Sequence, residues 1–488
     1  MDWSEQQENF FAAAADRDRG NLVVRARAGS GKTTTAVEGV HRAPPGGKLM
    51  TAFNKKNVVE LQRRLPQDVT VQTLHSLGLA TLRRHLRVHI DTDKGMRIAR
   101  EVAKTVPRPP PSPFYEADRA ERELPWTLMR LVSLFKGAQP ADMNEAVRMV
   151  YDFDAYNVVY SAQQMAQLAA ECLRRAAADP RVVDFADMIY LPRRLNLAPA
   201  PYGLVVIDET QDMNRGQLSL VLEAGSRVIA VGDEAQAIYR WRGADEHAMA
   251  RIIEGLDAEV LPLSVTYRCP QAVVDFVKNE LGDLDDFQAA EGAPAGRVEY
   301  TEDLRPELGD YVLSRFNAPL VQEALAVART GRKVQIQGTD LSGQLNGMIG
   351  ASKARTPKDL LKWSREAFQA ERNELLEADM PHQVSRLRDK HSVLGVLARE
   401  CSTLGNVKAA ARRLFATSNA EPHSVVTFST VHRAKGDERH RVWMLGSTFD
   451  PTMNTEERNI FYVAATRARE ELYIVEDPYD EILEGWIA

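Results

Sequence analysis

Cysteine is scarce in this sequence, and the three cysteine residues lie far apart. Cys172, Cys269 and Cys401 are odd in number, and none belongs to a CxxC motif or to a cluster of cysteine and histidine. Such isolated cysteines support neither a zinc ribbon nor an iron–sulfur cluster. We therefore expect a reduced, intracellular protein without a cysteine-bound metal.

Long apolar runs and an excess of basic charge are missing as well. The first residues, MDWSEQQENFF, contain no basic region followed by an apolar stretch, and no later segment approaches the length of a membrane span. The formal net charge is −6, so any nucleic-acid site has to be a local groove rather than a field over the whole protein. We expect a cytoplasmic protein, or a nuclear one in a eukaryotic source, with no membrane partner.

The chain does contain a repeated alternation of short apolar runs and helical patterns. Its 488 residues, 44% of them apolar, are enough for two to four domains with large cores. The first three runs end in, or lead into, glycine or acidic residues, as strands do where they deliver a site at the carboxyl edge of a sheet. The alternation predicts an α/β fold with parallel sheets. The expected strands are residues 21–26, 202–208, 227–233, 311–316, 333–338, 424–430, 441–447 and 471–477.

Two stretches break this alternation. Residues 85–175 carry helical periodicity, interrupted by the proline-rich segment VPRPPPSPF at 106–114, and residues 340–422 read as wholly helical. Their charged faces are typical of solvated helix surface. We interpret both stretches as helical insertions, one in each α/β unit.

A phosphate-binding loop follows the first expected strand. The segment ARAGSGKTTT (26–35) opens a helix directly after the strand, and its glycines allow backbone N–H groups to crowd a phosphate. Lys32 would reach the β- and γ-phosphate oxygens, and the Thr33 hydroxyl would bind Mg²⁺. Ala26 stands where the usual first glycine would be, so the motif is the relaxed form. The expected nucleotide contacts of this loop are Ala28, Gly29, Ser30, Gly31, Lys32, Thr33 and Thr34.

An acidic run ends the second expected strand. In VVIDETQD (205–212), Asp208 would hold Mg²⁺ through water, and Glu209 would orient and deprotonate the attacking water. Together with the phosphate loop this run predicts hydrolysis of a nucleoside triphosphate. A small-molecule kinase needs no such Asp-Glu-Thr-Gln run.

Further motifs connect the chain to a family. In order, they are TAFNKKNVVELQRRL (51–65), VQTLHSLG (71–78), GDEAQAIYRWRGAD (232–245), LSVTYRCP (263–270), FSTVHRAKGDE (428–438) and ERNIFYVAATRARE (457–470). With the phosphate loop and the acidic run, their order and spacing resemble the UvrD/Rep group of superfamily 1 helicases. The resemblance covers the chain apart from the two helical insertions. AFNKK and TLHSLG also resemble the F-box DNA helicase branch of this group, although no F-box is evident.

The resemblance implies two RecA-like motor domains with ATP in the cleft between them. We expect the first domain at residues 1–84 and 176–265, with a helical accessory insertion at 85–175. We expect the second at residues 266–339 and 423–488, with a small helical insertion at 340–422. That insertion is much smaller than the corresponding domain of large members, so the resemblance supports translocation more strongly than unwinding.

The resemblance also assigns nucleotide contacts. Gln7 matches the adenine-reading glutamine, with Gln6 as the other candidate, and Gln236 matches the γ-phosphate sensor. Tyr267 is expected to stack on adenine, and Glu438 to contact ribose or phosphate. Arg268 and Arg467 would act as arginine fingers that stabilise the charge of the transition state. Asp437 and Cys269 depart from the residues usual at these positions.

The expected contacts to DNA come from both halves of the chain. Tyr239 and Trp241 would stack on exposed bases, a mode that tolerates any base sequence, and Arg242 would engage the backbone or a neighbouring base. The other strand contacts implied by the resemblance are Phe53, Asn54, Thr73, His75, Thr430 and His432.

These assignments predict an ATP-dependent DNA helicase that moves 3′→5′ on single-stranded DNA, with ATP and Mg²⁺ as cofactors. Its expected partners are single-stranded DNA and junctions of single- and double-stranded DNA, and we expect a monomeric motor. A translocase that strips proteins from DNA remains an alternative, as does a nucleotide-switched clamp with little turnover. Retention of Glu209, Arg268 and Arg467 counts against the clamp.

Overall fold

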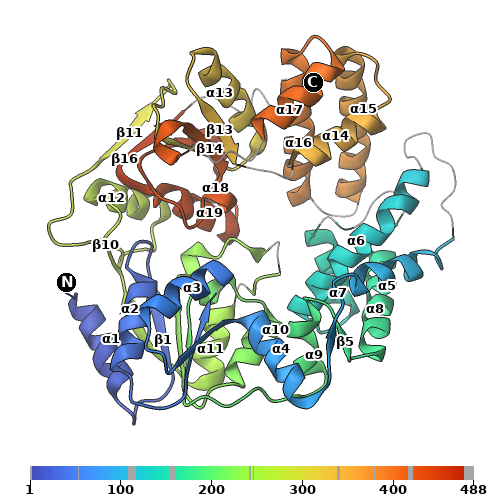
Figure 1. Cartoon of the computed structure of the whole chain (residues 1–488). Coiled ribbons are helices and arrows are strands. Elements are labelled where there is room, and N and C mark those ends of the chain that lie inside the picture. Colours follow the sequence, from blue (N-terminus) through green and yellow to red (C-terminus); the bar gives the residue numbers. More distant parts are fainter. Residues whose placement is uncertain are drawn as a thin grey trace. The chain divides into compact units, whose positions relative to one another are not determined.

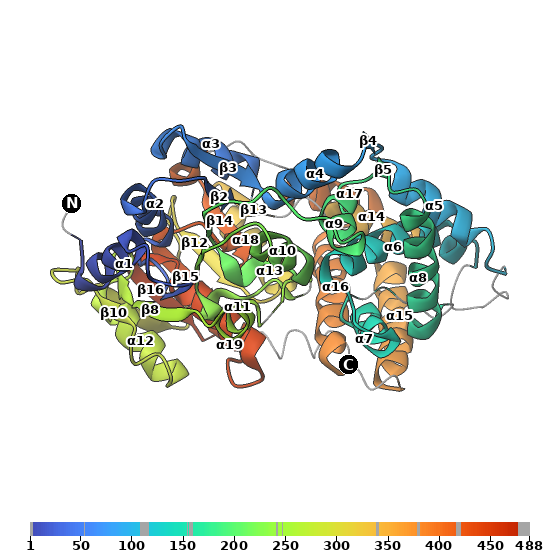
Figure 2. The same ribbon diagram turned by 90° about the horizontal axis from the view of Figure 1, so that it is seen from below.

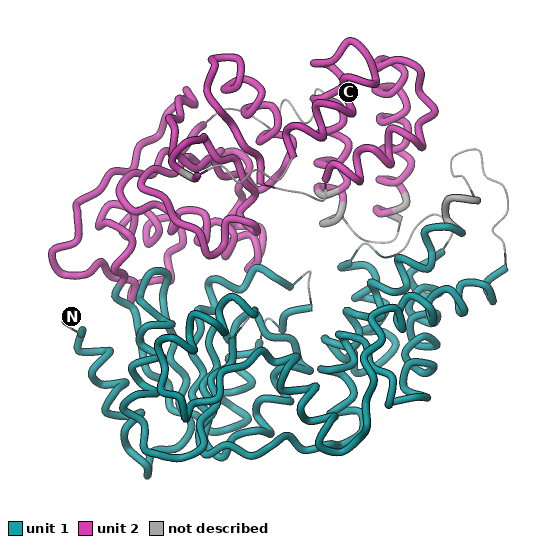
Figure 3. The backbone as a smooth tube through the Cα atoms, in the orientation of Figure 1, with its two compact units in different colours: residues 1–265 teal, residues 266–488 magenta. Residues whose placement is uncertain are grey.

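The computed structural model describes residues 3–52, 54–107, 117–153, 155, 160–240, 243–245, 247–337, 341–377, 381–415 and 421–476 (Figure 1). The chain divides into two compact units, residues 1–265 and 266–488, which are coloured separately in Figure 3. No helix among the described residues combines the length and the apolar character that crossing a membrane requires.

A six-stranded sheet forms the centre of unit 1. Its strand order is β3-β2-β6-β7-β1-β8, and every neighbouring pair is parallel. All six carboxyl ends therefore meet at one edge, where loops deliver side chains to a common site. The strands are β1 (Leu22–Ala26), β2 (Lys48–Ala52), β3 (Val69–Thr73), β6 (Leu204–Ile207), β7 (Val228–Gly232) and β8 (Glu259–Leu263).

Helices cover both faces of this sheet and bury two separate hydrophobic clusters. One cluster contains Phe10 and Phe11 of the first helix, and Gly39 lets the Phe10 ring approach the second helix closely. The other cluster contains Leu74, Leu218 and Met249. The helices are α1 (Glu5–Ala15), α2 (Lys32–Arg42), α3 (Lys55–Arg64), α4 (Leu74–His85), α9 (Asp187–Arg194), α10 (Arg215–Leu222) and α11 (Ala248–Leu256).

The helical insertion of unit 1 has a hydrophobic core of its own, built around Leu128, Phe135 and Met165. Its helices are α5 (Lys94–Ala103), α6 (Ala117–Ala138), α7 (Met143–Asp152) and α8 (Ala162–Ala178), next to the short parallel pair β4 (His89–Ile90) and β5 (Val182–Val183).

Unit 2 repeats the parallel arrangement. Its six strands have the order β11-β16-β15-β12-β14-β13, again with every neighbouring pair parallel. They are β11 (Arg297–Thr301), β12 (Tyr311–Ser314), β13 (Val334–Gln337), β14 (Val426–Thr430), β15 (Arg439–Leu445) and β16 (Ala468–Val475). A two-stranded sheet of β9 (Val265–Thr266) and β10 (Gln288–Ala289) precedes them.

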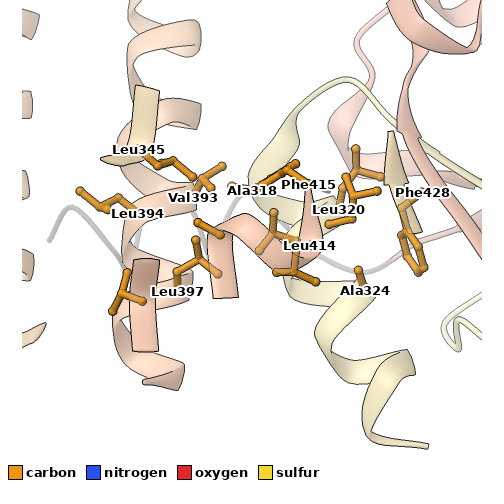
Figure 4. Packing of buried hydrophobic residues seen from close by; sticks show 14 of the residues in the cluster. Ala318, Leu320, Ala324, Leu345, Val393, Leu394, Leu397, Leu414, Phe415 and Phe428 are labelled. Carbon is orange, nitrogen blue, oxygen red and sulfur yellow. The ribbon is translucent and has the colours of Figure 1, made fainter. Parts of the chain in front are cut away.

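The small insertion of unit 2 shares one hydrophobic cluster with the sheet. Leu394 and Leu397 of the insertion belong to the same cluster as Leu320 and as Phe428 of β14 (Figure 4). The helices of this unit are α12 (Gln271–Leu281), α13 (Asn317–Arg329), α14 (Leu341–Ala351), α15 (Pro357–Glu377), α16 (Pro381–Glu400), α17 (Leu404–Leu414), α18 (Val431–Ala434) and α19 (Thr455–Ala465). Two α/β units with parallel sheets, each with helices inserted, confirm the predicted fold class.

Candidate functional site

The phosphate loop connects β1 to α2 in unit 1. Gly29 and Gly31 have φ angles of 73° and 78°, a left-handed backbone that glycine adopts without strain. Ser30 is fully buried, and its Oγ finds no hydrogen-bond partner among the described residues. Lys32, at the first position of α2, is also buried. Backbone N–H groups at a helix N-terminus, an available hydroxyl and a lysine together suit a phosphate.

The two expected magnesium ligands lie side by side. The Thr33 hydroxyl donates a 2.6 Å hydrogen bond to Oδ2 of Asp208, which follows β6. Burial raises the pKa of Asp208 to about 6, the nearby Glu209 adds to this rise, and the Thr33 bond opposes it. Hydroxyl and carboxylate oxygens fit a hard cation such as Mg²⁺. Among the described residues no cluster of three or more acidic, histidine or cysteine side chains is placed to hold a metal.

Glu209 begins a chain of short hydrogen bonds that ends at Gln236. Its Oε2 accepts a 2.6 Å bond from Nε2 of Gln211, and Oε1 of Gln211 accepts a 3.0 Å bond from the backbone N–H of Asp233. Oδ2 of Asp233 then accepts a 2.6 Å bond from Nε2 of Gln236. Gln211, Asp233 and Gln236 are all buried, and burial raises the pKa of Asp233. This series of hydrogen bonds, here termed the amide relay, links the expected catalytic base Glu209 to the expected γ-phosphate sensor Gln236.

The two N-terminal glutamines occupy different places. Gln6 exchanges two 2.8 Å hydrogen bonds with Ser264, which follows β8. Gln7 caps α1 by accepting from the Ser4 backbone N–H, and its Nε2 donates to Thr35 Oγ1 at 2.9 Å. A Cβ on Gly31 would lie only 3.9 Å from Nε2 of Gln7. The structure therefore places Gln7 against the phosphate loop and Gln6 beside Ser264.

In unit 2 the expected nucleotide contacts form one polar cluster. Nε of Arg268 bonds to the Glu438 carboxylate, and Arg268 also donates to the Thr466 carbonyl oxygen at 3.4 Å. Arg467 donates to the carbonyl oxygens of Val463 at 2.8 Å and Asp437 at 3.2 Å. Burial, together with Arg268, lowers the pKa of Arg467 to about 10.

The remaining unit 2 contact, Tyr267, is 52% exposed. Glu438, expected to touch ribose or phosphate, is in this structure the partner of Arg268 and lies 3.5 Å from Arg469.

The expected DNA contacts of unit 1 lie at the carboxyl ends of neighbouring strands. Asn54 follows β2 and caps α3 by accepting from the Asn57 N–H, while Thr73 ends β3 and caps α4 by accepting from the Ser76 N–H. His75 lies on the first turn of α4, and Tyr239 is half-buried after β7. Phe53, Trp241 and Arg242 lie outside the described residues.

In unit 2, Thr430 ends β14 and His432 lies on α18, which follows directly. Each of these two residues is half-buried.

Phe185 is an additional candidate that sequence reasoning missed. Its side chain is 62% exposed, and its ring stacks on His75 with centroids 3.8 Å apart and planes 16° from parallel. Burial lowers the pKa of His75 to about 4, so this imidazole is neutral at pH 7. His75, Asp208 and Glu209 also line one small pocket, so the ring pair and the two expected catalytic acids are neighbours. In the sequence Phe185 is an aromatic residue between Asp184 and Asp187, just before a helix, and this pattern indicates no particular function.

Sequence profiles of known helicase domains match this chain, one in each of the two units. The sequence profile of the UvrD/REP helicase N-terminal domain matches residues 3–256, and that of the UvrD-like helicase C-terminal domain matches residues 425–475. ATP-dependent DNA helicase PcrA of Bacillus subtilis is 25% identical over 296 residues, covering 52% of this chain and 36% of that protein. DNA helicase II of Escherichia coli is 26% identical over 313 residues, covering 56% of this chain and 41% of that protein.

A crystal structure of Arterivirus nonstructural protein 10, a helicase, aligns with 98% of this chain and 64% of that chain, at 13% identity and a TM-score of 0.36. The present chain matches less than half the length of the curated relatives, 36% of PcrA and 41% of DNA helicase II. The N-terminal profile alone spans more than half of the chain and contains the phosphate loop, the acidic run and the amide relay. The chain therefore belongs to the UvrD/REP helicase family.

Proposed function

We propose that this chain is a DNA-stimulated ATPase that moves 3′→5′ along single-stranded DNA and unwinds duplex DNA. The observation that carries the proposal is the amide relay, which connects Glu209 with Gln236 at the start of the DNA-binding loop. An ordinary nucleotide-binding protein has no need for such a connection. Family membership and the names of the relatives support the choice of ATP and DNA.

Hydrolysis follows from the geometry of unit 1. The phosphate loop and Lys32 would bind the β- and γ-phosphates, and Thr33 with Asp208 would hold Mg²⁺. When bound, this ion neutralises developing charge on the phosphate oxygens. Glu209 would orient the attacking water and accept its proton, and Gln236 would contact the γ-phosphate.

Other side chains would bind the adenine base of ATP and stabilise the transition state of hydrolysis. Gln7 beside the phosphate loop and the exposed Tyr267 would contact adenine, and Glu438 would fix Arg268 or contact the ribose. Arg268 and Arg467 of unit 2 would stabilise the negative charge of the transition state. Arg467 would first have to exchange its bonds to Val463 and Asp437 for phosphate oxygens, which would make hydrolysis depend on a rearrangement.

Single-stranded DNA would run over the carboxyl edges of the sheets. Tyr239 and Trp241 would stack on bases, and Phe185 with His75 would provide a second stacking position. Arg242, Phe53, Asn54, Thr73, Thr430 and His432 would supply the other strand contacts. Because the amide relay begins at Glu209 and leads toward this loop, ATP hydrolysis would be coupled to release of a base. We propose a monomer that binds single-stranded DNA and its junctions with duplex.

Strand separation tests polarity and unwinding together. Two duplexes of the same sequence, one with a 3′ single-stranded tail and one with a 5′ tail, are incubated with the full chain, ATP and Mg²⁺. We expect unwinding of the 3′-tailed substrate, and none with a non-hydrolysable ATP analogue or with Arg467→Ala. Preference for the 5′ tail would contradict the polarity. ATP-dependent displacement of a tail-bound protein without unwinding would instead indicate a protein-stripping translocase.

A further inference from the structure

Two segments of unit 1 contain no acidic residue at all. Residues 69–90 and 188–207 lack Asp and Glu, yet together they hold five arginines and three histidines. The formal net charge of the whole chain is −6, so this local excess of positive charge contrasts with the rest of the molecule. Clusters of this kind are the usual electrostatic footprint of a phosphate-binding surface.

The fold brings these two segments together through α4 and α9. The helices lie side by side in Figures 1 and 2, and they pack closely because Gly78 has no side chain. A Cβ at Gly78 would lie 1.8 Å from the carbonyl oxygen of Met188. At their N-terminal ends His75 stacks on Phe185, and at their C-terminal ends His85 bonds the Ala198 carbonyl oxygen at 3.0 Å. The helices therefore run parallel, with stacked rings at one end.

The other end of the helix pair carries exposed positive charge. We call it the basic end, and its members are Arg83, Arg84, His85, Arg87, His89, Arg193 and Arg194, all exposed. Arg193 donates to Gln139 at 2.9 Å and Arg84 to the Pro199 carbonyl oxygen at 3.5 Å, both neutral acceptors. Within the described part of the chain, none of the five arginines forms an ion pair with a carboxylate. Their charges are therefore not neutralised by any carboxylate of the described residues.

Stabilisation of α4 and α9 explains the presence of only some of the basic residues at the basic end. Basic residues in a last turn offset the negative end of the helix dipole, worth roughly 0.3–1 kcal/mol each at the surface. Arg83, Arg84, Arg193 and Arg194 can do so, because they lie in the last turns of α4 and α9. Arg87 and His89 lie beyond the end of α4, where the dipole offers no such stabilisation. Arg87 therefore extends the positive surface rather than the helix.

We propose that the basic end binds the phosphate backbone of duplex DNA next to the single strand. The inference rests on the proposed function, because it places the single strand at the His75–Phe185 ring pair. From His75 to Arg83 the helix rises about 12 Å, at about 1.5 Å per residue. A single strand is bound by stacking on large aromatic rings, and the basic end contains no Phe, Tyr or Trp. A duplex hides its base faces and presents phosphates to such a surface.

Neighbouring arginines at two helix ends allow a matched test. The double variant Arg83→Gln/Arg84→Gln removes two charges from the last turn of α4, and Arg412→Gln/Arg413→Gln removes two exposed charges from the last turn of α17. Binding of each full-length variant is measured on a 3′-tailed duplex, on blunt duplex and on the tail alone, over a range of salt concentrations. A second variant, Arg87→Gln/His89→Gln, leaves both helix ends intact.

For Arg83→Gln/Arg84→Gln we expect about tenfold weaker binding to the tailed and blunt duplexes. The slope of log affinity against log salt should fall by about two, since each phosphate contact contributes roughly 0.9. Binding to the tail alone and the ATPase activity with single-stranded DNA should stay unchanged, which also shows that the variant folds. Arg87→Gln/His89→Gln should act in the same direction, and Arg412→Gln/Arg413→Gln should not.

Equal losses on the tail alone would overturn the proposal, because the basic end would then serve the single strand. Unchanged duplex binding in both variants would also overturn it and would favour an acidic protein as the partner. Absence of DNA-stimulated ATPase in the unaltered chain would contradict the proposed function instead, while the blunt-duplex measurement would still decide the role of the basic end.

Discussion

Gln211 is the residue that joins the expected catalytic base to the rest of the amide relay. One end of its amide donates to Glu209 and the other accepts from the Asp233 backbone, so the side chain can hardly move without moving Glu209. Glu209 itself has a φ of 53°, a left-handed backbone that a non-glycine residue adopts only where its surroundings hold it. The geometry gives Gln211 a positioning role, since we place no contact between it and the nucleotide.

Replacing Gln211 with alanine should therefore slow turnover without weakening ATP binding. We expect kcat in saturating single-stranded DNA to fall at least tenfold, while KM for ATP changes less than threefold, because only the orientation of Glu209 is lost. Steady-state ATPase assays over a range of ATP concentrations measure both values. Gln164→Ala, which removes a capping glutamine from α8, is the control and should leave both unchanged. A rise in KM with unchanged kcat in Gln211→Ala would refute the positioning role.

Residue identity alone predicted part of this site. Lys32, Thr33, Asp208 and Glu209 belong to motifs in which chemistry dictates the residue type, so a single sequence reveals them. Gln211 lies inside one of these motifs, but its bonds depend on the distance between the ends of β6 and β7. Phe185 stands near position 75 only because α4 and α9 pack together, and no sequence pattern encodes that packing.

At the scale of elements, most strands with an apolar run were predictable, including the edge strand β13, whereas the edge strands β8 and β11 were not. β6 and β7 are continuous apolar runs, and β1, β12 and β14 are buried strands with a few polar residues, because parallel central strands are covered on both faces. β8 and β11 lie at sheet edges, and their residues are mostly exposed or half-buried. Polar residues are therefore mixed with apolar ones in these strands, and a search for apolar runs does not detect them. β2 and β3 were noticed only as motif segments, since Thr51 and Gln72 interrupt their apolar character.

The small helical insertion was predicted as helical, and the structure adds how it packs. Leu394 and Leu397 share a hydrophobic cluster with Phe428 of the sheet, whereas the insertion of unit 1 has a separate core. Helices that share a close-packed core with a sheet resist displacement from it. We expect α14–α17 to move together with the sheet of unit 2 rather than as a separate body.

A buried histidine in this insertion makes its stability depend on pH. His391 of α16 bonds to Ser364 of α15 at 2.9 Å, and burial, with a smaller contribution from Lys390, lowers its pKa from 6.5 to about 3. In the unfolded chain His391 is therefore protonated below about pH 6.5, whereas in the folded chain it is protonated only below about pH 3. Stability is complete above pH 6.5 and falls as the pH drops toward 3, by about 2 kcal/mol at pH 5.

Urea unfolding of the full chain at pH 7 and pH 5 measures this loss. In His391→Gln the difference between the two pH values should shrink by about 2 kcal/mol, because the titrating group is gone. His423→Gln, which replaces an exposed histidine, is the control and should leave the difference unchanged. An unaltered pH dependence in His391→Gln would show that this histidine does not titrate on unfolding.

At the scale of the whole molecule, the two units supply different parts of one proposed reaction. Unit 1 holds the phosphate loop, the acidic run, the amide relay and the His75–Phe185 ring pair. Unit 2 holds the cluster of Arg268, Glu438 and Arg467. The motifs follow one another along the chain, and the segment LSVTYRCP (263–270) crosses the boundary between the two units. The basic end was not predictable, since its two acid-free segments lie about a hundred residues apart and only the fold joins them.

The central claim is that DNA drives ATP hydrolysis at the site around Lys32. The most direct measurement is the steady-state rate of ATP hydrolysis by the full chain, with Mg²⁺, in the presence and absence of single-stranded DNA, beside the Lys32→Ala variant. We predict strong stimulation by DNA in the unaltered chain and no hydrolysis in Lys32→Ala, because the lysine contacts the phosphates in our proposal. A rate that does not respond to DNA, or that survives in Lys32→Ala, would contradict the proposed motor.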